Sequence, residues 1–232
     1  MTKCNKVSRG LSVALCALVF LFFAPTSFSE EMGAVKIGNK EFFLPLPKGF
    51  CESSKTIWGR RYTSFLSDLG ISAGGDPKIL NVFRDCETLR SEKHAHHPKL
   101  WGYLAFDRKA GRVWLGQGTL NRRLRKALSI EDPKNLENQL QDLTDKSLEK
   151  MKANIRIGEI NLICKPVETK RGFMTCGLTR LVTGSGYQDV YLISVVFLRN
   201  KEVLTLTLYR NANKINDLET LVNVGKEYLS AL

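Results

Sequence analysis

The first twenty-nine residues constrain the rest of the chain most, because they indicate the compartment in which it folds. The segment begins with three cations and no acid: Lys3, Lys6 and Arg9. Residues 11–24 then form an almost wholly apolar run, and Ser27 and Ser29 occupy the third and the last position before the expected cleavage point. This order is typical of a secretory signal peptide. We therefore predict a signal peptide over residues 1–29 and a single secreted domain over residues 30–232.

The same apolar run argues against a membrane span. Its length of about 14 residues falls short of the ~20 that a helix needs to cross a bilayer, and no second long apolar run follows. We expect an exported protein, in a bacterial periplasm or secreted, with no transmembrane segment after signal cleavage. Because export separates the chain from nucleic acid, we expect no nucleic-acid partner.

Four cysteines remain once the signal peptide is removed: Cys51, Cys86, Cys164 and Cys176. An even number in an oxidising compartment indicates disulfide bonds. Four cysteines allow three pairings, and local geometry favours one. Cys164 and Cys176 lie nearly opposite each other on a predicted hairpin that turns at 169–172, where facing residues come within bridging reach. By elimination Cys51 pairs with Cys86, and the chain lacks the Cys-x-x-Cys motif of a redox site.

Apolar periodicity divides the mature chain into strands and helices. We predict strands or hairpins over 34–46, 79–83, 157–165 and 173–209, a hairpin joining 100–106 to 113–115, and helices over 57–69, 132–151 and 216–232. Gly70 is expected to stop the first helix. The order of these segments favours an α+β fold, an antiparallel β-sheet covered by helices, over a parallel α/β sheet.

The opening and closing strands carry a resemblance. A hairpin that ends in the sequence Phe-Leu-Pro-Leu-Pro-Lys-Gly-Phe over 43–50, a meander of antiparallel strands, and a terminal helix after the strand 204–208 are similar to the PsbP-like fold and resemble uncharacterised secreted bacterial proteins built on that plan. The resemblance implies a PsbP-like sandwich and an accessory or binding role rather than catalysis. It transfers no catalytic residue to this sequence.

Two motifs resemble catalytic or metal-binding sites, and we compare each with the segments around it. Residues 70–74 spell G-x-S-x-G, but a nucleophile elbow needs a strand before Ser72 and a helix after it, and here a helix precedes the serine. His94, His96 and His97 could supply two zinc or copper ligands, yet neighbouring residues of an extended segment point to opposite sides and no other histidine completes the shell. We therefore predict no catalytic residue, no metal site and no cofactor.

Positive charge is concentrated in one stretch of the chain. The formal net charge is +12, and loss of the three signal-peptide cations leaves +9. Residues 90–126 hold ten Lys and Arg against two acids. The densest run contains Arg122, Arg123, Arg125 and Lys126, and four aromatic residues precede it: Trp101, Tyr103, Phe106 and Trp114.

Cations interleaved with aromatic rings are typical of surfaces that bind phosphates or lipid headgroups, although most charge runs are simply solvated. We predict that the four cations bind an anionic envelope component, which would be a lipid headgroup, a glycolipid or an acidic protein. The leading hypothesis is a secreted or periplasmic, non-enzymatic accessory or binding module of the cell envelope. The alternative is a small secreted hydrolase, metal-dependent or serine-based.

Overall fold

A computed structural model describes residues 32–37, 39–72, 76–91, 98–108, 113–128, 155–183, 186–214 and 216–232, together with single residues at 142, 145 and 149. The signal peptide predicted over residues 1–29 and the histidines of 94–97 lie outside these ranges, as does most of the helix predicted over 132–151. The described residues all belong to one compact unit, Met32–Leu232.

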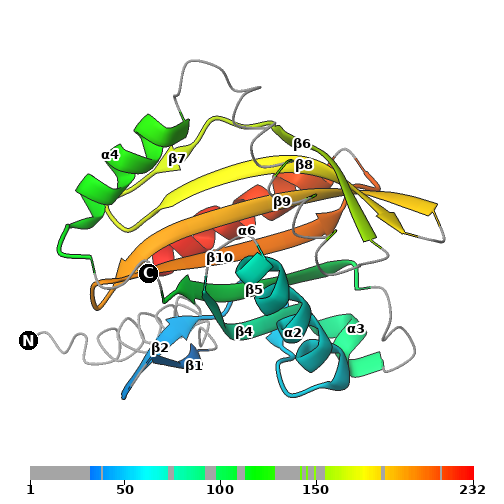
Figure 1. Cartoon of the computed structure of the whole chain (residues 1–232), viewed down its shortest axis with the longest axis horizontal. Coiled ribbons are helices and arrows are strands. Elements are labelled where there is room, and N and C mark those ends of the chain that lie inside the picture. The colour runs from blue at the N-terminus through cyan, green and yellow to red at the C-terminus, as the bar shows by residue number, and fades with distance from the viewer. Residues whose placement is uncertain are drawn as a thin grey trace, which may run out of the picture. The chain divides into compact units, whose positions relative to one another are not determined.

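An eight-stranded antiparallel sheet forms the centre of this unit (Figure 1). Its strands are β3 (Phe50–Glu52), β4 (Pro77–Asp85), β5 (Leu100–Asp107), β6 (Ile155–Leu162), β7 (Val167–Glu168), β8 (Phe173–Thr183), β9 (Gly186–Arg199) and β10 (Glu202–Asn211). The order across the sheet is β3-β4-β5-β10-β9-β8-β6, and the short β7 also pairs with β8. The predicted α+β class is confirmed.

Helices lie on both faces of this sheet. They are α2 (Ile57–Ser72), α3 (Cys86–Ser91), α4 (Gln117–Leu128) and α6 (Asn216–Ala231), and a separate two-stranded hairpin is formed by β1 (Met32–Ile37) and β2 (Lys40–Pro45). In Figure 1, α2 crosses in front of β4 and β5, whereas α6 runs behind β9 and β10. We call these two sides of the sheet the front face and the back face.

The core fills the space between the back face and α6. Strand alternation sends every second residue of β9 and β10 backward, and these are almost fully buried: Ile193, Val195, Phe197, Leu204, Leu206 and Leu208. Leu221 and Leu229 of α6 pack against them. Gly225 lets the helix come close, because a Cβ at this position would stand 2.5 Å from both Met174 Sδ and Ile193 Cδ1.

Two disulfide bonds join the cysteine pairs that the sequence predicted. Cys51 of β3 is bonded to Cys86, the first residue of α3, with their Cα atoms 4.9 Å apart. Cys164 follows β6 and is bonded to Cys176 of β8, with 5.6 Å between the Cα atoms. The second bridge lies where the hairpin argument placed it, since Ile163 N donates to Cys176 O at 3.2 Å.

Two sequence predictions about local structure are wrong. Residues 113–115 do not form a hairpin with β5, because β5 lies inside the sheet between β4 and β10, and Val113 N instead donates to Lys201 O at 2.9 Å. The first helix does not stop at Gly70 but continues to Ser72. Gly70 is needed for close packing rather than as a helix end, because a Cβ there would lie 2.2 Å from Pro77 Cγ.

Candidate functional site

The helix α4 carries all four of the cations that the sequence singled out. Arg122, Arg123, Arg125 and Lys126 are exposed. At 100° per residue they span about 160° of the helix circumference, so they share one half of it. Leu120 and Asn121 are buried on the opposite half. The helix is therefore amphipathic, and every charged residue on its outward side is a cation.

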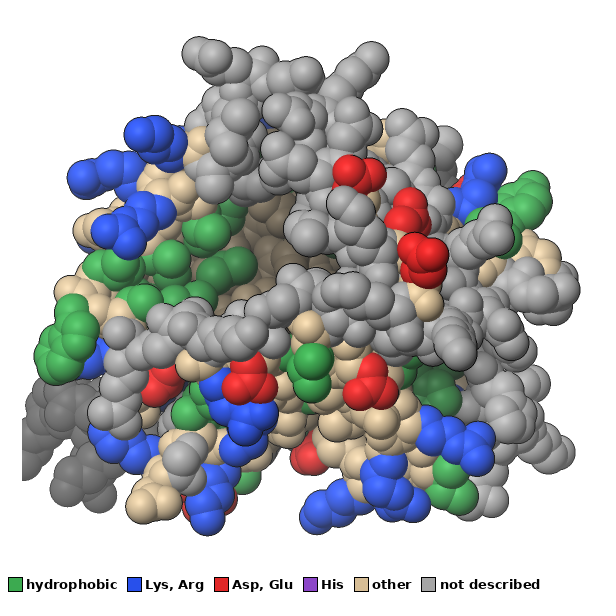
Figure 2. Space-filling model, viewed as in Figure 1, with side chains coloured by type: hydrophobic (Ala, Val, Ile, Leu, Met, Phe, Trp, Pro, Cys, Tyr) green, Lys and Arg blue, Asp and Glu red, His purple; other side chains and the backbone are tan. Residues whose placement is uncertain are grey.

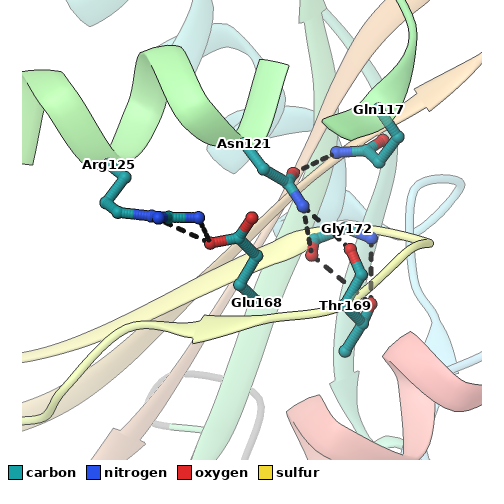
Figure 3. Close-up of polar contacts among 6 residues, drawn as sticks. All are labelled: Gln117, Asn121, Arg125, Glu168, Thr169 and Gly172. Atoms are coloured by element: carbon teal, nitrogen blue, oxygen red, sulfur yellow. Dashed lines mark hydrogen bonds and ion pairs between the residues drawn. The ribbon is translucent and has the colours of Figure 1, made fainter. Parts of the chain in front are cut away.

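A line of three polar side chains, spaced four residues apart, fixes α4 to the sheet (Figure 3). Gln117 Oε1 accepts a hydrogen bond from Leu198 N of β9 at 2.7 Å, and Gln117 Nε2 donates to Asn121 Oδ1 at 2.6 Å. Asn121, which is only 1% exposed, donates through Nδ2 to Thr169 O at 2.8 Å. One side of the helix is thus bonded both to β9 and to the turn that precedes β8.

Arg125 is the third member of this line. Its Nε donates to Glu168 Oε2 of β7 at 3.0 Å, and its Nη2 contacts the same oxygen (Figure 3). The pair is largely exposed to solvent, so it contributes at most about 1 kcal/mol to folding. Among the residues that the structure describes, Arg122, Arg123 and Lys126 form no ion pair.

Two turns bring further cations to the same end of the molecule. The turn between β7 and β8 contributes Lys170 and Arg171, and the turn between β9 and β10 contributes Arg199 and Lys201, all exposed. Both turns adjoin residues that are bonded to α4, as described above. We call these four residues and the four α4 cations the cationic end. The three segments that form it contain only two acids, Glu168 and Glu202.

An exposed tryptophan stands at the start of α4. Trp114 is 83% exposed, which is the highest value among the large apolar side chains that the structure describes. Lys201 Nζ lies 3.4 Å from the centroid of its indole ring, a cation–π contact that joins this segment to the turn between β9 and β10. The turn itself is tight, with φ of 51° at Asn200 and 70° at Lys201.

The surface around α4 is hollowed beside the cations. Figure 2 shows Lys and Arg side chains gathered over α4 at the left of the view, and hydrophobic side chains lie between them and a hollow. The hollow therefore borders the inner side of α4, whereas the cations point outward.

The predicted basic stretch over 90–126 does not form one surface. Asn211 N, at the last residue of β10, donates to Lys99 O, whereas Lys201 lies just before the first residue of β10. A ten-residue strand is about 33 Å long, so Lys99 and the cationic end lie at opposite ends of the sheet. The structure therefore keeps the four predicted α4 cations together and separates them from Arg90 and Lys99.

Two cavities lie near Lys99 at the other end of the sheet, and acids balance the cations there. One has a volume of about 340 Å³ and is lined by Lys48, Arg210 and Glu227, among others. Lys48 Nζ lies 3.5 Å from Glu227 Oε2, and Arg210 Nη2 lies 2.7 Å from Asp217 Oδ1. The other, of about 580 Å³, is lined by Arg90 together with the acids Asp85 and Glu87.

A partly buried aromatic group on the front face was not anticipated from the sequence. Arg84 lies over the Trp58 ring at 5.0 Å, and Trp101 stacks on Tyr209 with centroids 5.4 Å apart. Burial raises the pKa of the Tyr62 and Tyr209 hydroxyls well above the ordinary value. These contacts fasten α2 to β4 and β5 and have a structural role.

The residues proposed for the hydrolase alternative give no assembled site within the described ranges. Ser72 is the last residue of α2, and β4 follows it, so a helix enters the G-x-S-x-G segment and a strand leaves it. No group of three or more His, Cys, Asp and Glu that could hold a metal ion occurs within the described ranges, and the three histidines fall outside them. Among the described helices, none is long and apolar enough to cross a membrane.

Sequence reasoning missed the cations of the two turns and the polar line that holds α4. The turn over 169–172 was predicted from the sequence, but nothing in the local sequence indicates that α4 lies beside either turn. No protein-family model matches the chain, and a comparison with curated proteins found no match.

Proposed function

We propose that this protein is an exported, non-enzymatic binding module of the cell envelope, and that its cationic end binds an anionic partner. One observation carries the proposal: Arg122, Arg123 and Lys126 project from a helix that is fixed to the sheet, without an ion-pair partner among the described residues. Cations that only keep a surface solvated do not require a helix that a buried asparagine fixes to the sheet.

The fixed helix favours binding because the backbone positions that carry its cations are set before the partner arrives. The bonds of Gln117 and Asn121 join α4 to two separate parts of the sheet. Binding then costs less conformational entropy than it would for cations on a flexible segment. The turn cations Lys170, Arg171, Arg199 and Lys201 extend the positive surface and attract anions over about 8 to 10 Å at physiological salt.

The proposal predicts weaker binding to a soluble polyanion when the α4 cations are replaced. The test variant carries glutamine at Arg122, Arg123, Arg125 and Lys126. Exposed ion pairs contribute roughly 0.5 kcal/mol each, so affinity for dextran sulfate at low salt should fall by about 30-fold. Isothermal titration calorimetry on protein purified after export measures the change.

A matched control removes the same amount of charge elsewhere. Glutamine at Lys55, Lys99, Lys214 and Lys226 neutralises four exposed cations that lie outside the cationic end. This control should lose far less affinity than the α4 variant. Equal losses in the two variants would show that net charge alone attracts the polyanion, and the proposal would be wrong.

A further inference from the structure

We infer that the anionic partner is the surface of an anionic lipid bilayer, on which Trp114 acts as an aromatic anchor beside the cations of α4; this rests on the function proposed above. The inference begins with the tryptophan. Indole rings are amphipathic and concentrate at membrane–water interfaces, where the ring lies among the headgroups. A soluble acidic partner would account for the cations but would leave the exposed ring unexplained.

Contacts within the structure hold the ring at the surface. Lys201 Nζ lies 3.4 Å from the Trp114 ring centroid, and the neighbouring Val113 N donates to Lys201 O at 2.9 Å. The indole is 83% exposed even so. The ring is thus presented outward by a backbone hydrogen bond and a cation instead of packing into the adjacent apolar surface.

The ring and the cations are close enough to contact one membrane surface. Trp114 precedes Gln117, the first residue of α4, by three positions, and the twelve-residue helix is about 18 Å long. Arg122, Arg123 and Lys126 therefore follow the ring within the length of one short helix. Each cation near an anionic leaflet strengthens binding by about fivefold, and the indole ring adds an interfacial contact to this electrostatic attraction.

The orientation of α4 indicates surface docking rather than insertion. Its apolar side, with Leu120 buried, faces the protein, and its polar side faces outward. An interfacial helix that inserts would turn its apolar side toward the lipid. Here the helix would lie against the headgroups through its cations, and Trp114 alone would reach into the interface.

Tryptophan quenching tests this directly, with protein purified after export. Vesicles contain phosphatidylglycerol and phosphatidylcholine in equal parts, and a second set contains phosphatidylcholine alone. The protein should bind the first set and not the second, and brominated lipid should quench part of its fluorescence. Trp114→Phe should abolish that quenching, because Trp101 is buried and Trp58 is partly covered by Arg84.

Two further variants distinguish the contribution of the Trp114 ring to vesicle binding from that of the cations. Trp114→Ala should weaken vesicle binding several-fold and leave dextran sulfate binding nearly unchanged. Phe43→Ala, a control at another exposed apolar side chain on β2, should change neither. Unchanged vesicle binding by Trp114→Ala, or quenching that persists in Trp114→Phe, would overturn the lipid inference.

The polyanion titration distinguishes failure of this inference from failure of the proposed function. If the protein binds dextran sulfate through α4 but does not bind the anionic vesicles, the partner is a soluble or polymeric anion and only the lipid inference fails. If it binds neither, both fail.

Discussion

Asp217 shows how one side chain can organise a helix start. Its Oδ2 accepts hydrogen bonds from Lys214 N at 2.7 Å and Asn213 N at 3.1 Å, and its Oδ1 accepts one from Arg210 Nε at 2.8 Å. The sequence predicted a helix over 216–232, and the helix does begin at Asn216. The side chain that binds the preceding backbone, however, is the buried Asp217.

The carboxyl of Asp217 should make the stability of the protein depend on pH. Burial by itself raises its pKa, but the hydrogen bonds from Lys214, Arg210 and Asn213 outweigh burial and hold the pKa below the ordinary value. A depressed pKa stabilises the fold above the unfolded-state pKa of about 3.9, and this contribution is lost as pH falls through the folded-state pKa. Asp217→Asn should therefore have a lower urea midpoint than wild type at pH 7.

The difference between the two proteins should begin to shrink as pH falls below about 4, where the unfolded chain takes up the proton, and its charge-dependent part should be gone once pH lies below the depressed folded-state pKa, because wild-type Asp217 is then protonated in both states. Urea unfolding at a series of pH values measures it. A difference that stays constant from pH 7 to pH 3 would mean that the carboxylate charge contributes nothing and that the amide merely packs poorly.

The sequence predicted most of the described long helices and strands, but it did not predict the helix α4. The elements α2 and α6 and the long strands β8, β9 and β10 have strong apolar periodicity, and all were predicted with nearly correct bounds. The α4 segment has leucines at helical spacing, Leu120, Leu124 and Leu128, but its other residues are mostly polar, and it was recognised from the sequence only as a run of cations. Its docking depends on Asn121 and on carbonyls more than 45 residues away, which no local pattern reveals.

Replacing Asn121 should loosen α4 from the sheet. Asn121→Ala removes the donor to Thr169 O and the acceptor for Gln117 Nε2, and it leaves these partly buried groups without that partner. Such a loss costs about 1 to 3 kcal/mol. The urea midpoint should fall accordingly, and dextran sulfate affinity should fall less than in the four-cation variant. Thr119→Ala, at an exposed position of the same helix, should be nearly neutral.

A neutral Asn121→Ala variant would mean that α4 is held by packing and not by the polar line. Amide hydrogen exchange over residues 117–128 provides the independent measurement. Faster exchange should be confined to this helix in Asn121→Ala and absent in Thr119→Ala.

The topology of the sheet explains why the cationic end exists at all. In an antiparallel meander, the turn that enters β8 and the turn between β9 and β10 lie at the same end of the sheet. That part follows from strand order and could be predicted. The position of α4 beside those turns could not, because the wrongly predicted hairpin at 100–115 placed the preceding segment in the sheet. The charge count over 90–126 left open which of its cations share a face, and it gave no sign of the cations of both turns.

The two disulfides should open in a fixed order under native conditions. Cys51 and Cys86 are both partly exposed, and their bridge fastens the short edge strand β3 to α3. Cys176 is fully buried in the core, so a thiolate can attack this bridge directly only at the sulfur of the partly exposed Cys164, whereas both sulfurs of the Cys51–Cys86 bridge belong to partly exposed residues. Mild dithiothreitol should therefore reduce Cys51–Cys86 well before Cys164–Cys176, as timed alkylation and peptide mass mapping would show.

The bridge that opens first also closes the longer loop, so its loss should affect stability strongly. In the chain-entropy model, a loop of 35 residues corresponds to about 4 kcal/mol. Cys51→Ala combined with Cys86→Ala should lower the urea-derived free energy of unfolding by roughly that amount, and vesicle binding should persist because the cationic end lies at the other end of the sheet. Simultaneous reduction of both bridges would contradict the predicted order of opening. Loss of vesicle binding by a folded double variant would contradict the expectation that the cationic end does not depend on the Cys51–Cys86 bridge.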